Sequence, residues 1–176
     1  DEKIKKIPGR SVPNDLYNIF SDEIKKYLIE WGLPCNTVYF DKTENDIEID
    51  SKPRSHYGKG FRAIYQSAFM IGLMDYCLNN NKFHPFFLIL DSPLTTYKEQ
   101  DKDKIQKDDE VSENIQELFY KSLSKYDKDS EFQIFLIENK DPEEKIKKLI
   151  TYEHFSKNAN VDRYGFFPLI DQSKGE

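Results

Sequence analysis

Two glycines flank a lysine at Gly58, Lys59 and Gly60, directly before an apolar stretch that is predicted to be a helix. Glycines at the start of a helix expose backbone N–H groups, and the helix dipole and the lysine charge favour an anion there. Arg54 and Arg62 bracket the turn, and their guanidinium groups suit phosphate or carboxylate. The same residues are also compatible with a tight strand-to-helix turn beside solvated arginines, so both interpretations stay open.

Two acidic residues stand at the ends of apolar runs that are predicted to be strands. Asp91 follows FFLIL, and Glu138 follows FQIFLI. Open α/β sheets bind ligands at the carboxyl ends of their strands, so Asp91 could hold the magnesium of a nucleotide through water and Glu138 could position a water. Each acid could instead cap the turn that follows it, the second one before Pro142.

Composition excludes several classes of protein. The chain has 176 residues, 33% charged and 38% hydrophobic, with a net charge of -6, which argues against both disorder and a globally basic nucleic-acid binder. Cys35 and Cys77 lack the spacing of a zinc site or a disulfide framework, so a reduced, cytoplasmic setting is expected. No apolar run approaches the roughly 18 residues that span a bilayer, so no membrane partner is expected.

The hydrophobic pattern predicts an α/β protein with helices covering a mainly parallel sheet. Apolar residues recur at helical spacing up to Trp31, before Gly32 and Pro34, and a hairpin precedes the glycine turn. FFLIL is continuous enough to predict a strand buried on both faces. The predicted helices are 13–31, 61–78, 112–126 and 142–153, and the predicted strands are 37–40, 46–49, 86–90 and 132–137.

The ordered set GKGFRA, FFLILDSPL and FQIFLIENKD resembles the carboxy-terminal lobe of an ABC-type ATPase head. More narrowly it is similar to the SMC, RecN and RecF-like group, in which a long coiled coil separates two half-heads. The resemblance covers about residues 37–141. It implies a signature turn at 55–60, a Walker B strand at 86–91, a D-loop at 92–96 and a switch at Glu138-Asn139.

From this resemblance follow ATP and Mg²⁺ as cofactors and a set of site residues. The implied catalytic residues are Asp91, Glu138 and Ser92, with Asp91 also linked to the metal. The implied nucleotide-binding residues are Ser55, Gly58, Lys59, Gly60, Arg62 and Asn139.

The chain departs from the family pattern at several positions. His56 stands where the signature has a serine, with Ser55 one step away, and Ser92 replaces the glutamate that usually follows the Walker B aspartate. Glu138 is the first candidate to replace that glutamate, and Glu99 is a poorer one. The switch histidine is absent, and so is any G-x-x-x-x-G-K-[ST] loop. Hydrolysis is therefore expected only when this lobe is joined to an amino-terminal lobe with a Walker A loop.

The expected organisation is a linker or lead-in at 1–12, an amphipathic helix at 13–34 at the foot of a coiled-coil arm, and the ATPase lobe at 35–176. The expected partners are the missing amino-terminal lobe, a second head in a homodimer and, for the whole protein, DNA during repair, maintenance or phage defence. Without its other lobe, this lobe is expected to expose an apolar face. Two alternatives stay open: a non-hydrolysing, nucleotide-dependent clamp or interaction module, and an unrelated α/β domain that binds a nucleotide or phosphate.

Overall fold

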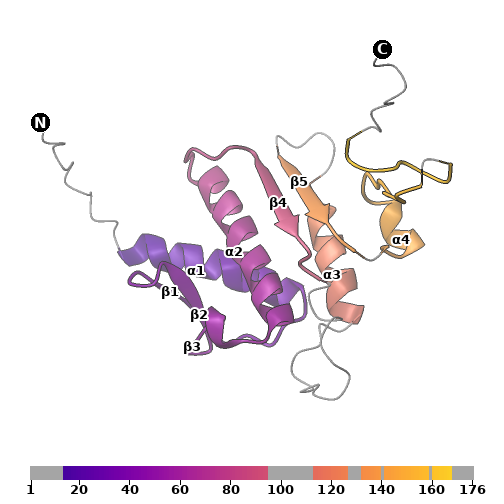
Figure 1. The fold of residues 1–176 in the computed structure, drawn as a ribbon. Coiled ribbons are helices and arrows are strands. Elements are labelled where there is room, and N and C mark those ends of the chain that lie inside the picture. The colour runs from indigo at the N-terminus through magenta and orange to yellow at the C-terminus, as the bar shows by residue number, and fades with distance from the viewer. Residues whose placement is uncertain (1–13, 95–112, 127–131, 140, 159, 168–176) are drawn as a thin grey trace, which may run out of the picture. The chain divides into compact units, whose positions relative to one another are not determined.

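The computed structural model describes residues 14–94, 113–126, 132–139, 141–158 and 160–167. The chain forms two compact units, Asp1–Asp141 and Pro142–Glu176, which are described one at a time. The first unit contains an α1–α2 helix pair, a small antiparallel sheet and a parallel pair of strands with a helix (Figure 1). The mixed α/β class expected from the sequence is confirmed. In the described residues the parallel sheet has only two strands, and the other three strands form a separate antiparallel sheet.

Two long helices pack along each other at the start of the first unit. Helix α1 spans Asn14–Glu30 and α2 spans Lys59–Asn79, within two residues of the predicted ends. The helices approach closely at Gly72, where a Cβ would lie 3.0 Å from Ile24 Cγ1 and 3.3 Å from the Ile24 backbone nitrogen. A larger side chain at this position would push the two backbones apart. After α1, Gly32 adopts a φ of 76° and ends the helix, as expected.

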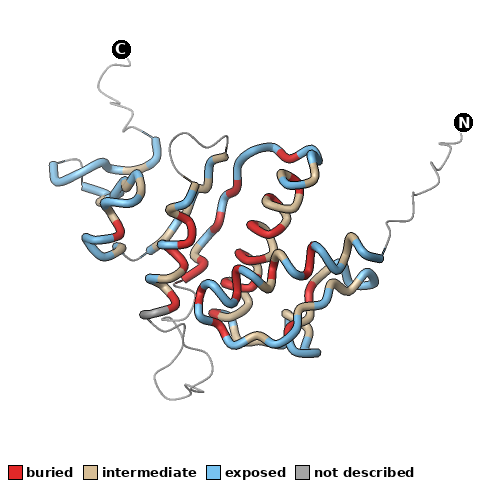
Figure 2. Tube along the Cα trace, turned by 180° about the vertical axis from the view of Figure 1, so that it is seen from behind, coloured by how far each residue is buried: buried red, intermediate tan, exposed pale blue. Residues whose placement is uncertain are grey.

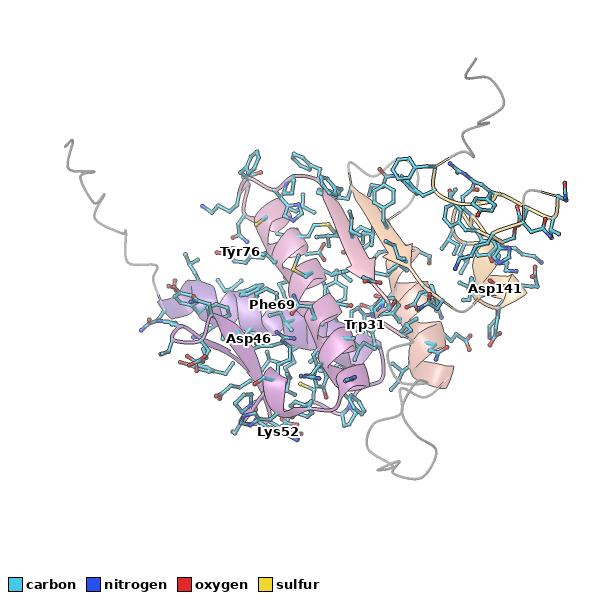
Figure 3. The ribbon with its side chains drawn as sticks, viewed as in Figure 1. Trp31, Asp46, Lys52, Phe69, Tyr76 and Asp141 are labelled. Atoms are coloured by element: carbon cyan, nitrogen blue, oxygen red, sulfur yellow. The ribbon has the colours of Figure 1, made fainter. Side chains whose placement is uncertain are left out.

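The core between α1 and α2 is rich in aromatic rings. Phe20 of α1 lies 5.4 Å from Phe69 and 5.9 Å from Tyr76 of α2, measured between ring centroids, and Phe40 also contacts Phe69 (Figure 3). Figure 2 shows buried residues along both helices. The two contacts of Phe20 are edge-to-face and the contact of Phe40 is stacked, and such ring contacts add to the free energy gained by burying the rings.

A polar cluster closes the other end of this helix pair, and we call Tyr27, Asp75, Lys125 and Tyr126 the tyrosine clasp. The Tyr27 hydroxyl donates to Asp75 Oδ2, and the Tyr126 hydroxyl donates to Asp75 Oδ1 at 2.7 Å. The two hydroxyl oxygens lie 2.7 Å apart, and Lys125 Nζ donates to the Tyr27 oxygen at 2.7 Å. The clasp therefore ties α1 and α2 to the segment that follows α3.

The predicted hairpin leads into the glycine turn. Strand β1 (Val38–Asp41) pairs antiparallel with β2 (Asp46–Ile49), and β2 pairs with β3 (Lys52–Pro53). A turn at Asp50 and Ser51, both with positive φ, joins β2 to β3. A 3₁₀ helix, η1 (Arg54–His56), then leads to α2. The hairpin prediction is confirmed to within one residue.

The two apolar runs form adjacent parallel strands. Strand β4 spans Phe87–Asp91 and β5 spans Gln133–Ile137, in a register that sets Asp91 opposite Ile137. Helix α3 (Glu113–Leu123) precedes β5, as predicted. Because the strands are parallel and in register, their carboxyl ends meet at one edge of the sheet (Figure 1).

The prediction that the first of these strands is buried on both faces is wrong. Leu88 and Leu90 are buried, whereas Phe87 and Ile89 are 48% and 57% exposed. Phe135 and Ile137 of β5 are 44% and 55% exposed. Successive side chains of a strand point to opposite faces, and in the described part of the chain only one face is covered. We call Phe87, Ile89, Phe135 and Ile137 the open sheet face.

The second unit has little regular structure. The predicted helix 142–153 is wrong in length, since α4 spans only Glu144–Lys147. A bond from the Leu149 N–H to the Ile146 carbonyl, 2.8 Å long, follows the helix, and the described residues after it contain no further helix or strand. Across the described segments, no helix is long and apolar enough to cross a membrane.

Candidate nucleotide-binding site

Three of the predicted catalytic residues lie together where β4 and β5 end. The Ser92 N–H donates to the Ile137 carbonyl at 2.7 Å, and Ser92 Oγ donates to Asp91 Oδ1 at 2.9 Å. Two residues further along the turn, the Leu94 N–H donates to Glu138 Oε1 at 2.8 Å. The turn after β4 is thus bonded to the end of β5, and it places Asp91, Ser92 and Glu138 at one edge.

Burial and backbone geometry fix this turn. Pro93 and Leu94 are buried, so the turn is anchored on its inner side. Ser92 has a φ of 49°, a left-handed conformation that is costly for residues other than glycine. Asp91 is exposed beside it, which leaves its carboxylate accessible to a ligand.

Helix α3 brings a tyrosine into the electrostatic surroundings of Glu138. Burial and, to a smaller extent, the Glu138 carboxylate together raise the pKa of Tyr120 to about 12. Tyr120 therefore stays protonated at neutral pH. The neighbours of the Glu138 carboxylate thus include the Leu94 N–H and the neutral side chain of Tyr120.

The predicted nucleotide-binding residues gather at the start of α2. Gly58 is the N-cap, with φ -60° and ψ 160°, and the Arg62 N–H donates to its carbonyl at 2.9 Å. The first N–H groups of a helix have no carbonyl partner inside the helix, and the first turn of α2 carries no acidic side chain. Gly60 is buried and Lys59 is exposed, so this helix end presents a positive dipole and a cation.

A shallow, open depression lies beside that helix end. Its lining includes Arg54, Lys59, Arg62, Ala63 and Gln66. We call it the cationic depression, because three of its five lining side chains are positively charged.

Arg54 is held in this depression by a two-bond ion pair. Arg54 Nε donates to Asp46 Oδ1 and Arg54 Nη2 donates to Asp46 Oδ2, each at 2.8 Å. Asp46 Oδ1 also accepts the Ile47 N–H at 2.8 Å. Both charged side chains are partly buried, which makes this pair better ordered than an exposed one.

The structure places the predicted residues in two groups. The first comprises Asp91, Ser92, Glu138 and the exposed Asn139 at the strand ends; the second comprises Gly58, Lys59, Gly60 and Arg62 at the start of α2. Ser55 and His56 are exposed in η1, just before the second group. The last two residues of the predicted D-loop and Glu99 lie outside the described residues, as does the predicted linker.

Sequence reasoning missed Asp46, Gln66 and the Leu94 N–H. Asp46 has a readable signal, because it and Arg54 lie at nearly equal sequence distances from the Asp50–Ser51 turn, and such positions face each other across a hairpin. Gln66 follows Arg62 by one helical turn, which places the two on the same face. The Leu94 contact depends on how β4 and β5 pair, which no local pattern reveals.

The strand ends fit a magnesium ion that is shared with a nucleotide. Among the described residues no group of three or more His, Cys, Asp or Glu side chains could hold a metal alone. Mg²⁺ commonly takes one or two carboxylates together with waters and phosphate oxygens, and Asp91 supplies one accessible carboxylate. Such an ion would need phosphate oxygens as further ligands.

Comparison with known proteins adds no family to this geometry. No protein-family model matches the chain, and no curated protein matches its sequence.

Proposed function

We propose that this chain is the carboxy-terminal lobe of an ABC-type ATPase head of the SMC/RecN-like group. In this proposal it supplies the Walker B aspartate and the signature turn for ATP-dependent head dimerisation and hydrolysis. One observation carries the proposal: Asp91 ends β4, Glu138 directly follows the parallel strand β5, and the Leu94 N–H donates to Glu138. Ligands of open α/β sheets bind at the carboxyl ends of the strands, so the exposed Asp91 and the hydrogen-bonded Glu138 lie where a nucleotide would bind.

Each residue group has its own task in this mechanism. Asp91 would hold Mg²⁺, which supplies charge neutralisation on phosphate oxygens when it is bound. Glu138, kept in place by the Leu94 N–H, would orient the attacking water. The turn Gly58–Gly60 and Lys59 would bind the terminal phosphate of a nucleotide held by the second head. Phosphoryl transfer depends mainly on such positioning and electrostatic stabilisation.

The open sheet face supports the proposed partner lobe. Parallel sheets are normally covered on both faces, and a two-stranded sheet is marginal by itself. The open sheet face carries four large apolar side chains, each between 44% and 57% exposed. An amino-terminal lobe that brings the Walker A loop would cover this face. In the whole protein, head dimerisation would be coupled through the coiled-coil arm to DNA repair, maintenance or phage defence.

The test joins this lobe to a lobe that carries the Walker A loop and measures ATP-driven dimerisation and ATP turnover, with and without DNA. Asp91→Ala is expected to abolish both activities. Asp22→Asn, which changes an exposed aspartate of α1, is the matched control and should leave both unchanged. Absence of turnover in the parent, together with normal dimerisation of Asp91→Ala, would contradict the proposal.

Action across the dimer has its own test. Asp91→Ala removes the metal-linked acid and Lys59→Ala removes the cation of the signature turn, so each homodimer should lose ATP-driven association. A mixed dimer keeps one composite site with both residues intact, because the two residues of one site come from different heads. Recovered association in the mixture supports action across the dimer, and no recovery argues against it.

A non-hydrolysing clamp is the second candidate, and Ser92 favours it. A hydroxyl follows Asp91 where the family has a glutamate, and its Oγ donates to Asp91 Oδ1 at 2.9 Å. The clamp hypothesis expects ATP-dependent association without turnover. If Ser92→Glu then created hydrolysis, the clamp hypothesis would be strengthened; turnover in the parent protein would exclude it.

A further inference from the structure

We propose that Arg54, positioned by Asp46, binds the terminal phosphate of a nucleoside triphosphate in the cationic depression, together with Arg62 and Lys59. This inference rests on the proposed function, because it adds residues to the phosphate-binding turn at the start of α2. It also reaches beyond that turn, since Asp46 and Arg54 come from the preceding hairpin and 3₁₀ helix.

The two-bond ion pair leaves Arg54 with donors to spare. A guanidinium carries N–H groups on three nitrogens, and the pair with Asp46 uses only one bond from Nε and one from Nη2. In the described residues, the Arg54 side chain makes no other hydrogen bond or ion pair. The remaining donors can therefore contact a phosphate while the Asp46 pair keeps the plane of the guanidinium fixed.

Charge in the depression favours a compact anion. Three cations line it, from Arg54, Lys59 and Arg62, and only Arg54 has an acidic partner among the described residues. The positive end of α2 adds to the same potential. This local excess stands out in a chain whose net charge is -6. The depression is open and shallow, so it suits the end of a phosphate chain that is held elsewhere better than a whole nucleotide.

Gln66 gives the depression a neutral polar group. It lies one helical turn after Arg62, on the same side of α2, and lines the depression with it. A side-chain amide can donate to a phosphate oxygen without adding charge. The three cations would then attract the phosphate, and the hydrogen bond from the Gln66 amide would orient it.

The first experiment titrates the chain with inorganic tripolyphosphate and follows the backbone and arginine side-chain signals by NMR. Signals of Arg54, Arg62 and the first turn of α2 are expected to shift together. Arg54→Ala should weaken binding about tenfold or more, because charge-assisted hydrogen bonds are lost. Arg163→Ala is the matched control, since Arg163 is an exposed arginine that also pairs with a carboxylate, Glu153, and lies in the second unit. Equal weakening by both variants would overturn the proposal.

Two further variants separate position from charge. Arg54→Lys keeps the charge but cannot form the two-bond pair, so it should bind nearly as weakly as Arg54→Ala. Asp46→Asn removes a negative charge, which by itself would strengthen anion binding, and it retains an oxygen that can accept the Ile47 N–H. If Asp46 acts by positioning Arg54, binding instead weakens a few-fold. Stronger binding by Asp46→Asn, or full binding by Arg54→Lys, would contradict the positioning role.

The nature of the anion is tested by competition. A single-stranded oligonucleotide with an equal concentration of phosphates is expected to displace tripolyphosphate much less well than ATP does. Better displacement by the oligonucleotide would overturn the assignment in favour of a nucleic-acid contact.

Failure of this inference and failure of the proposed function give different results. In the joined two-lobe protein, loss of ATP-driven dimerisation in Asp91→Ala with no change in Arg54→Ala would keep the function and reject the role of Arg54. Tripolyphosphate binding that depends on Arg54, together with normal dimerisation of Asp91→Ala, would keep the phosphate site and reject the ATPase lobe.

Discussion

Along α1 and α2 the large apolar side chains are buried or half-buried except Ile19 and Ile29, whereas along β4 and β5 about every second one is exposed. Ile24 and Ile64 are fully buried within the helix pair, and the tyrosine clasp closes one of its ends. On β4, Leu88 and Leu90 are buried but their neighbour Ile89 is 57% exposed. The facing sides of α1 and α2 are therefore covered within the described part of the chain. The strand pair, which carries Asp91 and Glu138, has one face still to be covered.

The two groups of candidate site residues lie on these two differently packed regions. Asp91 and Glu138 lie beside the open sheet face, although the turn between them is held by its own hydrogen bonds and by the buried Pro93 and Leu94. The cationic depression sits at the end of the well-packed α2. Under the proposed function, the cationic depression of one head and the Asp91–Glu138 strand ends of the other would act on one nucleotide. The depression would then be preformed, and the open sheet face beside the strand ends would be covered by the partner lobe.

The largest expected effect on stability is that of Phe119→Ala. Phe119 is fully buried on α3, and its ring centroid lies 4.7 Å from that of Trp31, which directly follows α1. Removing the ring leaves a cavity between α1 and α3, so the free energy of unfolding should fall by about 3–5 kcal/mol. Urea unfolding followed by circular dichroism measures this change. A loss below about 1 kcal/mol would mean that α3 is not part of the same cooperative core.

The next largest effect is expected at the tyrosine clasp. Tyr27→Phe removes the hydroxyl that bonds Asp75 and leaves Lys125 without an acceptor. Because one of these partners is a carboxylate, the free energy of unfolding should fall by about 1–3 kcal/mol. Tyr39→Phe is the matched control: Tyr39 is 55% exposed on β1, and its loss of a hydroxyl should be nearly neutral. Equal effects of Tyr27→Phe and Tyr39→Phe would mean that the tyrosine clasp does not stabilise the helix pair.

Stability should also fall in alkali. Burial raises the pKa of Tyr27 and Tyr126 above the usual 10.0, with the bonds to Asp75 acting in the same direction for both. Burial also raises the pKa of Tyr120 to about 12. A raised folded-state pKa means that the folded chain keeps protons which the unfolded chain releases. Stability is therefore full below about pH 10 and declines from there through pH 12, as urea titrations at several pH values can measure. In Tyr27→Phe the decline should be shallower, and an unchanged slope would argue against a role of this tyrosine.

The smallest expected effect on stability is on the open sheet face. Ile89→Ser and Phe135→Ser should change the free energy of unfolding by no more than about 0.5 kcal/mol, because both side chains already face outward. Self-association of the isolated chain, measured by sedimentation velocity, should decrease. Leu88→Ala is the control on the same strand. Leu88 is only 4% exposed, so its loss should cost about 2–5 kcal/mol. If Ile89→Ser cost as much as Leu88→Ala, the contrast between the two faces would be wrong.

The elements could be predicted from the sequence where one local rule dominates. Helical spacing of apolar residues predicted α1 and α2, and β-rich apolar runs predicted β4 and β5, each to within about two residues. The burial of FFLIL could not be predicted, because a continuous apolar run does not tell which face is covered within the same chain. The helix after Pro142 was predicted too long, since its apolar residues suit a helix but little packs on its later turns.

The candidate site divides in the same way. Asp91 and Glu138 are readable because they end apolar runs, and Gly58 is readable because glycines before a helix are distinctive. The pairing of Asp46 with Arg54 is readable from their nearly equal distances to the Asp50–Ser51 turn, but its two-bond geometry depends on how β2 turns into β3. No local sequence pattern shows that the Leu94 N–H reaches Glu138 across 44 positions.

The burial of Trp31 gives the chain an internal spectroscopic probe. It is the only tryptophan, and it is fully buried in edge-on contact with Phe119 of α3. Its buried indole N–H has no hydrogen-bond partner among the described residues, so its emission should be at short wavelength and should respond strongly to entering water. Any nucleotide or partner that shifts α1 against α3 would therefore be visible in the fluorescence of the unlabelled protein.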